Sequence, residues 1–272
     1  PDPLQGAAEP GLGLRIQPHR PAGCSRCAAP RSGIAAFPSP GCAADGAEFD
    51  HGGAQCAGAA DQMKGRFIVL EGIDGCGKTT QLDHLVRWLP ASGLMPDSAG
   101  LVQTREPGGT SLGRSVRELL LHTAADEAPA PIAELLLYAA DRSQHVETLI
   151  LPALERGDWV ISDRFSGSTL AYQGYGRGLN RLLIDQLEQI ATGGLQPDLT
   201  LLLELPLEES LRRRRGAAAD RIEAEGQAFL GRVSEGFAEI AQHKGWFRVD
   251  AAAAPEGVSQ ALEQVLLEQL GG

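Results

Sequence analysis

The chain has 272 residues, a formal net charge of −11 and 43% hydrophobic residues. This acidic balance argues against a nucleic-acid binder, because such proteins usually present an excess of Lys and Arg to the phosphate backbone. No run of 18 apolar residues occurs, which excludes a membrane-spanning helix. We therefore expect neither nucleic acid nor a membrane as partner, and instead a small anion held by a few local arginines.

Residues 1–62 differ in composition from the rest of the chain. They contain 10 Gly, 14 Ala and 8 Pro, so 32 of 62 positions are small or helix-breaking residues. Such a segment buries too little apolar surface to offset its ordering entropy. We expect a disordered, low-complexity extension, or an upstream segment foreign to the native protein. A single α/β domain should follow over 63–272.

The cysteines are unevenly distributed, since four of the five lie in this extension: Cys24, Cys27, Cys42 and Cys56. The first pair has half of a typical zinc-site spacing, but the second pair is 14 residues apart. Incidental thiols are therefore the favoured interpretation, with a zinc site as the alternative. The one cysteine in the predicted domain, Cys76, is typical of a reducing compartment, so we expect a cytoplasmic protein.

The first predicted strand, 66–71, leads into a glycine-rich turn and then a helix. The turn spells G-x-x-x-x-G-K-[ST], whose backbone N–H groups and helix N-terminus cradle nucleotide phosphates. We expect Lys78 to reach the β- and γ-phosphates and the hydroxyl of Thr79 to hold Mg²⁺. The predicted ATP-binding residues are Gly72, Ile73, Asp74, Gly75, Cys76, Gly77, Lys78, Thr79 and Thr80.

Further short apolar runs alternate with helical patterns along the domain. Strands are predicted at 101–105, 159–163, 200–204 and 247–249, and helices at 78–89, from 111, at 131–155, at 181–192 and along a C-terminal apolar stripe. This alternation predicts a five-stranded parallel sheet with helices on both faces. Ligands of such sheets bind beyond the carboxyl ends of the strands.

Two of these strand ends carry groups suited to phosphate and metal. Arg105 precedes a Pro-Gly-Gly turn, where it can offer a bidentate fork to a phosphate or simply pair with Glu106 on the surface. Asp163 ends the third strand, where it can hold Mg²⁺ while Arg164 meets phosphate oxygens. A salt-bridged strand end is the alternative for this second pair.

A run of four arginines, 212–215, precedes Gly216, three alanines and then Asp220-Arg221. Two interpretations fit this pattern equally well. The segment is either a flexible lid that closes its arginines over developing negative charge, or a solvated helix face.

Taken together, these segments resemble thymidylate kinases of the bacterial type, over residue 63 to the C-terminus. The matching stretches are 67–81, 104–110, 138–142, 163–165 and 168–174. The resemblance implies a P-loop kinase fold with a lid, and transfer of the γ-phosphoryl group of ATP to dTMP with Mg²⁺ as cofactor. The product would be dTDP, a precursor in dTTP synthesis, and the protein would be a homodimer.

The resemblance also assigns roles to residues. Asp74 would contact the 3′-hydroxyl of the sugar, Tyr138 would stack on thymine, and Arg142 would bond a thymine carbonyl. Tyr172 would crowd a ribose 2′-hydroxyl and so favour deoxynucleotides. The full set of predicted dTMP-binding residues is Asp74, Arg105, Tyr138, Arg142, Arg164, Ser168, Thr169, Tyr172 and Gln173.

The predicted metal ligands are Thr79 and Asp163. Because the phosphate loop contains no arginine, the resemblance places the missing cation in the lid, and the lid interpretation of 212–221 follows from it. Arg213 and Arg214 are further candidates for that role. The predicted catalytic residues are Lys78, Asp163, Arg164, Arg215 and Arg221.

Three other functions fit parts of the pattern. One is a kinase for another (deoxy)nucleoside monophosphate or a nucleoside. A second is a GTP-binding switch, but that needs an Asn-Lys-x-Asp segment, and the single asparagine, Asn180, precedes an arginine. A third is an inactive nucleotide-binding scaffold, which retention of Lys78, Asp163 and Arg164 disfavours.

Overall fold

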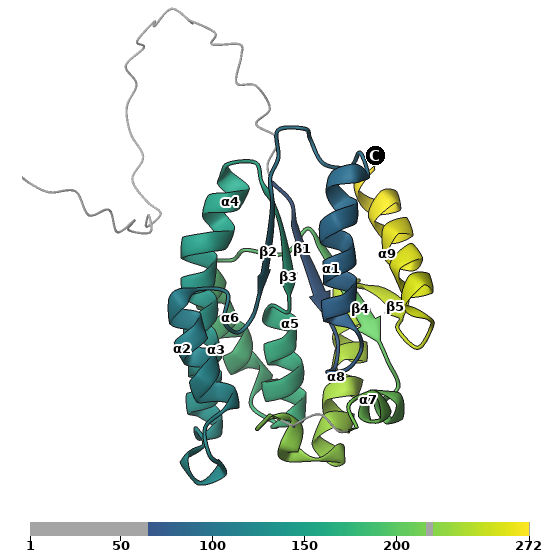
Figure 1. The fold of residues 1–272 in the computed structure, drawn as a ribbon. Coiled ribbons are helices and arrows are strands. Elements are labelled where there is room, and N and C mark those ends of the chain that lie inside the picture. The colour runs from purple at the N-terminus through teal and green to yellow at the C-terminus, as the bar shows by residue number, and fades with distance from the viewer. Residues whose placement is uncertain (1–64, 216–219, 272) are drawn as a thin grey trace, which may run out of the picture. The chain divides into compact units, whose positions relative to one another are not determined.

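The computed structural model describes residues 65–215 and 220–271. The expectations for 1–62, with the four cysteines, and for 216–219 in the lid lie outside this range. Five strands form one parallel sheet, as the sequence predicted, and their order is β2-β3-β1-β4-β5 (Figure 1). They are β1 (Phe67–Glu71), β2 (Leu101–Arg105), β3 (Trp159–Asp163), β4 (Leu199–Glu204) and β5 (Phe247–Asp250).

Helices cover the sheet. The described α-helices are α1 (Lys78–Trp88), α2 (Ser111–Leu121), α3 (Pro131–His145), α4 (Leu151–Glu155), α5 (Ser166–Thr169), α6 (Arg181–Thr192), α7 (Leu207–Arg213), α8 (Gln227–Lys244) and α9 (Pro255–Leu270). Shorter segments are the 3₁₀ turns η1 (Leu89–Ala91), η2 (Ala125–Glu127) and η5 (Glu223–Glu225), and the π-helical η3 (Val146–Ile150) and η4 (Leu170–Gly176). Within the described ranges, none of them combines the length and apolar character that a bilayer crossing requires.

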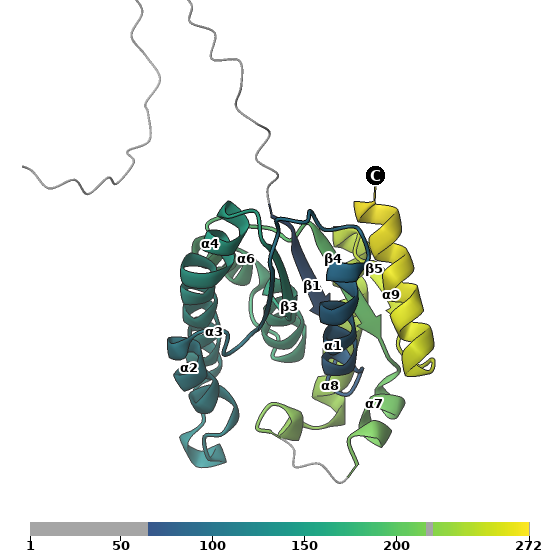
Figure 2. The ribbon, with the colours of Figure 1, turned by 45° about the horizontal axis from the view of Figure 1, so that its top comes forward.

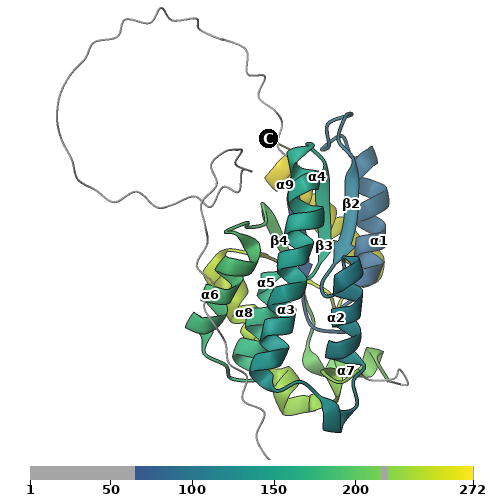
Figure 3. The same cartoon turned by 90° about the vertical axis from the view of Figure 1, so that its left-hand side faces the viewer.

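The alternation of side chains along β1 assigns its two faces. Ile68 and Leu70 belong to the core cluster that contains Leu85 of α1, whereas Phe67 and Val69 belong to a second cluster with η3 and α4. Figure 3 shows α1 on one side of the sheet and α4, α5 and α8 on the other. The long predicted helix over 131–155 is α3, η3 and α4 in direct succession. The predicted helices on both faces are therefore confirmed.

Helix α9 packs beside α1, as Figures 1 and 2 show. The hydroxyl of Ser259 donates to Gln81 Oε1 at 2.8 Å, and Gln81 Nε2 donates to the carbonyl of Pro255 at 3.0 Å. The C-terminal helix therefore buttresses the helix that begins at the phosphate loop.

The register of the sheet brings three segments to one edge. Asp163 is opposite Leu70 of β1 on one side and opposite Arg105 of β2 on the other. The chain leaves all three strands at their carboxyl ends, where ligands of open parallel sheets bind. The fold thus places the glycine-rich turn, the Arg105 turn and Arg164 side by side.

Candidate active site

The glycine-rich turn between β1 and α1 is shaped by its backbone. Gly72 has φ 145°, and a Cβ at this position would lie 2.6 Å from the carbonyl oxygen of Leu203. Gly77 caps α1 with φ 95°. Only glycine adopts these conformations without strain, so the loop can present backbone N–H groups to a ligand.

Lys78, the first residue of α1, is 7% exposed and folds back over this loop. Its Nζ donates to the carbonyls of Gly72 at 3.0 Å and Ile73 at 3.2 Å, and lies 4.0 Å from Asp74 Oδ1. The ammonium charge is thereby held at the mouth of the loop. Carbonyl oxygens are weak partners for it, so an anionic phosphate would compete well for the same charge.

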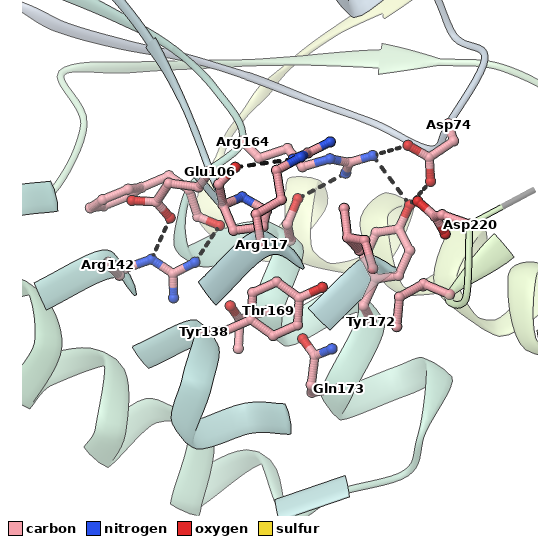
Figure 4. Close-up of a pocket in the computed structure, with 15 residues that line it drawn as sticks. Asp74, Glu106, Arg117, Tyr138, Arg142, Arg164, Thr169, Tyr172, Gln173 and Asp220 are labelled. Carbon is pink, nitrogen blue, oxygen red and sulfur yellow. Dashed lines mark hydrogen bonds and ion pairs between the residues drawn. The ribbon is translucent and has the colours of Figure 1, made fainter. Parts of the chain in front are cut away.

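Arg164 follows β3 and connects the loop to a second group of residues. Its backbone has φ 75°, an unusual value for a residue other than glycine and one that is found at functional sites. Its Nη1 donates to the carbonyl of Gly72 and to Ser168 Oγ, both at 3.0 Å. Its Nη2 pairs with the carboxylate of Asp74 and contacts the hydroxyl of Tyr172 (Figure 4).

Asp74 is the counter-charge of this arrangement. Burial opposes its ionisation, but Arg164 and Lys78 together hold the pKa of the Asp74 carboxyl below its ordinary value. The hydroxyl of Tyr172 donates to Asp74 Oδ2 at 2.7 Å. A carboxylate at the loop is therefore bonded to groups from two other parts of the site.

A pocket opens beside Asp74. Side chains from α2, α3, α5 and η4 line it, together with the segment after 219. Figure 4 shows Arg117 and Arg164 on one side of it and Tyr138, Thr169 and Gln173 on the other.

Arg142 forms one end of this pocket and is 1% exposed. Its Nε donates to Glu106 Oε2 at 2.8 Å, its Nη2 donates to the carbonyl of Phe165 at 3.1 Å, and its Nη1 pairs with the carboxylate of Glu188. These partners fix the guanidinium in one orientation. Tyr138, one helical turn earlier on α3, adds a flat ring to the same end.

Away from Arg142, the pocket is lined by Arg117 and Arg164, together with Asp74 and Asp220. Burial lowers the pKa of Arg117, and repulsion by Arg105 and Arg164 acts in the same direction. Arg117 donates to the carbonyl of Pro107 at 3.0 Å, which holds its side chain at the pocket. Arg117 and Arg164 in the lining, with Arg105 nearby, favour a bound anion.

The protein groups suit a magnesium ion that is shared with phosphates. Asp163 Oδ1 is buried and has no hydrogen-bond partner in the described part of the chain. Thr79 is exposed in the first turn of α1. Within 65–215 and 220–271, no group of three or more His, Cys, Asp or Glu residues could hold a metal. Mg²⁺ bound to one carboxylate, a hydroxyl and substrate phosphates needs no such cage.

Comparison with known proteins assigns the fold and site to a family. A family model described as thymidylate kinase matches residues 70–262. The thymidylate kinase of Parasynechococcus marenigrum (strain WH8102) is 75% identical over 209 residues, which cover 77% of this chain and all of that protein. The thymidylate kinase of Synechococcus sp. (strain CC9605) is 71% identical over 208 residues, covering 76% of this chain and all of that protein. The chain belongs to the thymidylate kinase family.

A solved structure of a thymidylate kinase, from Ehrlichia chaffeensis, has the same fold. It superposes with a TM-score of 0.59 at 35% identity, and the match covers 75% of this chain and 99% of that one. The family resemblance, the fold class and the kinase assignment made from the sequence are thereby confirmed.

Most residues predicted for the acceptor side of a thymidylate kinase lie together in the pocket. Those that line it are Asp74, Tyr138, Arg142, Arg164, Ser168, Thr169, Tyr172 and Gln173. Arg105 does not; its side chain is exposed, and its charge is felt by Arg117.

The lid arginines take different positions. Arg213 ends α7 and pairs with Glu209 on the surface, and Arg215 is exposed. The Arg214 side chain lies over the phosphate loop, since a Cβ on Gly75 would be 3.0 Å from its Cγ. Arg221 donates to the carbonyl of Leu120 at 2.7 Å and pairs with buried Glu134, so it lies outside the pocket lining. This position favours an anchoring role over the catalytic contact expected for Arg221.

Some residues in and around the site were absent from the sequence predictions. Arg117 lines the pocket, and its signal was an arginine on the helix directly after the Arg105 turn. Asp220 also lines the pocket. Glu71 and Glu134 lie outside the lining and bond residues of it. Both are fully buried carboxylates, a rare condition for Glu, but burial cannot be read from either position alone.

Proposed function

We propose that this chain transfers the γ-phosphoryl group of ATP to dTMP, giving dTDP and ADP. The observation that carries the proposal is one pocket with a flat ring and a fixed arginine at one end and clustered arginines at the other. That pocket meets the phosphate loop at Asp74. A base and a phosphate fit these two ends, with the acceptor phosphate directed at the loop.

On the donor side, residues 72–80 hold the triphosphate, and Lys78 leaves the Gly72 and Ile73 carbonyls for the β- and γ-phosphates. Thr79 and Asp163 would hold Mg²⁺, which neutralises phosphate charge when bound. The buried, unpartnered Oδ1 of Asp163 supports this assignment.

On the acceptor side, Tyr138 stacks on thymine and Arg142 donates to a base carbonyl, while Ser168, Thr169 and Gln173 complete the wall. Asp74 accepts from the 3′-hydroxyl. Tyr172 is 7% exposed, and its ring would crowd a ribose 2′-hydroxyl.

Arg164 bridges the two phosphates during transfer, with Arg105 and Arg117 on the acceptor phosphate. Arg215 supplies lid charge, helped by Arg214 above the loop. No general base is needed, because the acceptor phosphate is already an anionic nucleophile near neutral pH. The reaction depends on alignment and charge neutralisation.

A substrate panel tests the proposal. Purified protein with ATP and Mg²⁺ is assayed for ADP release with dTMP, dUMP, CMP and thymidine. We expect the highest kcat/KM with dTMP. A preference for CMP or for thymidine would replace the proposal with a different kinase, and ATP binding without turnover of any acceptor would indicate a scaffold.

We propose a homodimer through α2, α3 and α6. These helices pack side by side, and Figure 3 shows α3 between α2 and α6. They carry six of the seven exposed large hydrophobic side chains described: Leu112, Leu119, Ile132, Leu136, Leu182 and Ile190. A second copy of the chain would cover this face. Light scattering after size exclusion should report a dimer, and Leu136→Arg should shift it to a monomer. A monomeric wild-type protein would contradict this.

We propose that 63–272 is the functional unit and that it acts in the cytoplasm. The family match over 70–262 supports the boundary. Mass spectrometry of the N-terminus of the protein purified from its native cells, after cell fractionation, tests both points. Recovery from a non-cytoplasmic fraction, or activity that requires 1–62, would contradict them.

A further inference from the structure

Glu134 on α3 lies behind the base end of the pocket and is fully buried. Its carboxylate accepts Arg177 Nε at 2.6 Å and Arg177 Nη2 at 2.8 Å, and it pairs with Arg221 Nη2. Its Oε1 also accepts Gln173 Nε2 at 2.9 Å. Four N–H donors therefore converge on one carboxyl group.

These donors keep Glu134 ionised. Burial raises the pKa of its carboxyl, but the hydrogen bonds from Arg177, Arg221 and Gln173 outweigh this and leave the pKa below its ordinary value. An ionised carboxylate has no proton to donate. It can bond only the NH₂ group of the Gln173 amide.

The orientation of the Gln173 amide follows from this constraint. Gln173 lines the pocket and is 1% exposed, so its amide has little freedom to rotate. With the NH₂ group held by Glu134, the carbonyl oxygen is the end left for a ligand, and no donor from the described residues bonds it. Figure 4 shows the amide beside Thr169 and Tyr138.

The base end of the pocket therefore contains a fixed donor and a fixed acceptor. Arg142 donates, and Gln173 Oε1 accepts. Thymine and uracil carry a C4 carbonyl next to an N3–H, which matches this pair. Cytosine carries an amino group next to an unprotonated N3, which opposes it at both atoms. Rotatable Thr169 Oγ, which can donate or accept, sets no preference.

We propose that Glu134 is a specificity-determining positioning residue. By fixing the amide of Gln173, it selects monophosphates whose base carries an N3–H and rejects those with an unprotonated N3. This inference rests on the proposed dTMP kinase function. A purely structural Glu134 would instead only anchor Arg177 and Arg221.

The test compares dTMP with 5-methyl-dCMP, which has the same ring size and methyl group and differs at N3 and C4. In the Glu134→Gln variant the new amide can donate or accept, so Gln173 can turn its NH₂ group to the ligand. We expect the ratio of kcat/KM values, dTMP over 5-methyl-dCMP, to fall about 10- to 100-fold. An unchanged ratio in an active variant would overturn the proposal.

Arg177→Met is the matched control, because it removes two bonds to Glu134 and leaves the Gln173 bond in place. Its melting temperature should fall while the substrate ratio stays as in the wild type. If the ratio falls as far as it does in Glu134→Gln, then reduced stability of the pocket, and not the orientation of the Gln173 amide, controls the choice between the two substrates.

Gln173→Met keeps the inference testable if Glu134→Gln does not fold. It should lower kcat/KM for dTMP and leave that for 5-methyl-dCMP unchanged or raised. Where Glu134→Gln does fold, adding it to Gln173→Met should produce no further change in the ratio. Loss of 5-methyl-dCMP turnover equal to that of dTMP would overturn the assigned orientation. Wild-type protein that phosphorylates neither compound would instead refute the proposed function.

Discussion

The phosphate loop and the acceptor pocket are built in opposite ways. The loop is one continuous segment, and its proposed binding groups are backbone N–H groups together with the side chains of Asp74, Lys78 and Thr79. The pocket draws side chains from four helical segments and a later loop, and it buries charges in pairs such as Arg142 with Glu106 and Glu188. A site formed by the backbone can tolerate an unusual residue such as Cys76. In a pocket of paired buried charges, removal of one partner leaves the other buried without a counter-charge, so its desolvation is no longer compensated.

The largest expected effect is the loss of the Lys78 charge from the phosphate loop. In Lys78→Ala, kcat should fall by at least about 10³-fold, because the migrating phosphoryl group loses its fixed cation. The fold should persist, since within the described range Lys78 Nζ contacts only groups of the loop: two carbonyls, the Cys76 sulfur and, at 4.0 Å, the Asp74 carboxylate. ADP release and circular dichroism measure the two effects. Near-normal turnover would refute the donor assignment.

Arg164 belongs to both regions, so its removal tests whether they work as one site. Arg164→Ala should lower kcat by about 10³–10⁵-fold, the scale of arginine contributions to phosphoryl transfer. The apparent affinity for both substrates should fall as well, because Asp74 loses its main partner. Arg164→Lys serves as the control that keeps the charge without the fork. A tenfold or smaller loss in the alanine variant would contradict the bridging role.

Tyr172 tests the side-chain character of the pocket. Tyr172→Ala should raise the kcat/KM of UMP relative to dUMP by about 10-fold, because a void would replace the ring that we propose to crowd the 2′-hydroxyl. Tyr172→Phe keeps the ring and should retain the wild-type ratio. The two ratios, measured under identical conditions, must differ for the steric explanation to survive.

The smallest effect concerns pH and the crowded charges around Arg142. Burial and repulsion by Glu106 raise the pKa of Glu188 to about 7 from 4.5, although Arg142 opposes the shift. The folded state then holds a proton that the unfolded state releases, so the associated stability is complete below about pH 4.5 and is lost as the pH rises through 7. In Glu188→Gln this loss is absent. The melting temperature of the wild type should therefore fall by about 3–6 °C relative to the variant between pH 5 and pH 8. Parallel melting curves across this range would count against a raised pKa.

The same contrast explains what could be predicted from the sequence. All five strands and the phosphate loop were predicted, because each is encoded by a short local pattern of apolar residues and glycines. Helix α8 was not, although Phe229, Val233 and Phe237 recur at helical spacing. Its Gly236 resembles a loop residue, yet it is glycine because a Cβ there would lie 2.6 Å from the ring of Tyr175.

The pocket was predicted mainly through family resemblance, since its members are scattered along the chain. The position of Arg221 could not be foreseen, because it depends on partners 101 and 87 residues away. Arg221 bonds Leu120 and Glu134, and the sequence around Arg221 contains no pattern that predicts either contact.

Buried Glu71, at the end of β1, gives the two substrate sites a fixed spacing. Its Oε1 accepts the backbone N–H groups of Phe165 and Ser168, both at 3.0 Å, and its Oε2 accepts Ser168 Oγ at 2.6 Å. These hydrogen bonds attach β1, which leads into the phosphate loop, to α5, which lines the pocket. An inhibitor that joins an adenosine and a thymidine through a phosphate chain would have to span this fixed distance between the two sites. If the number of phosphates in the linker is varied one at a time, the affinity of the inhibitor should therefore be highest at one linker length and fall sharply on either side of it.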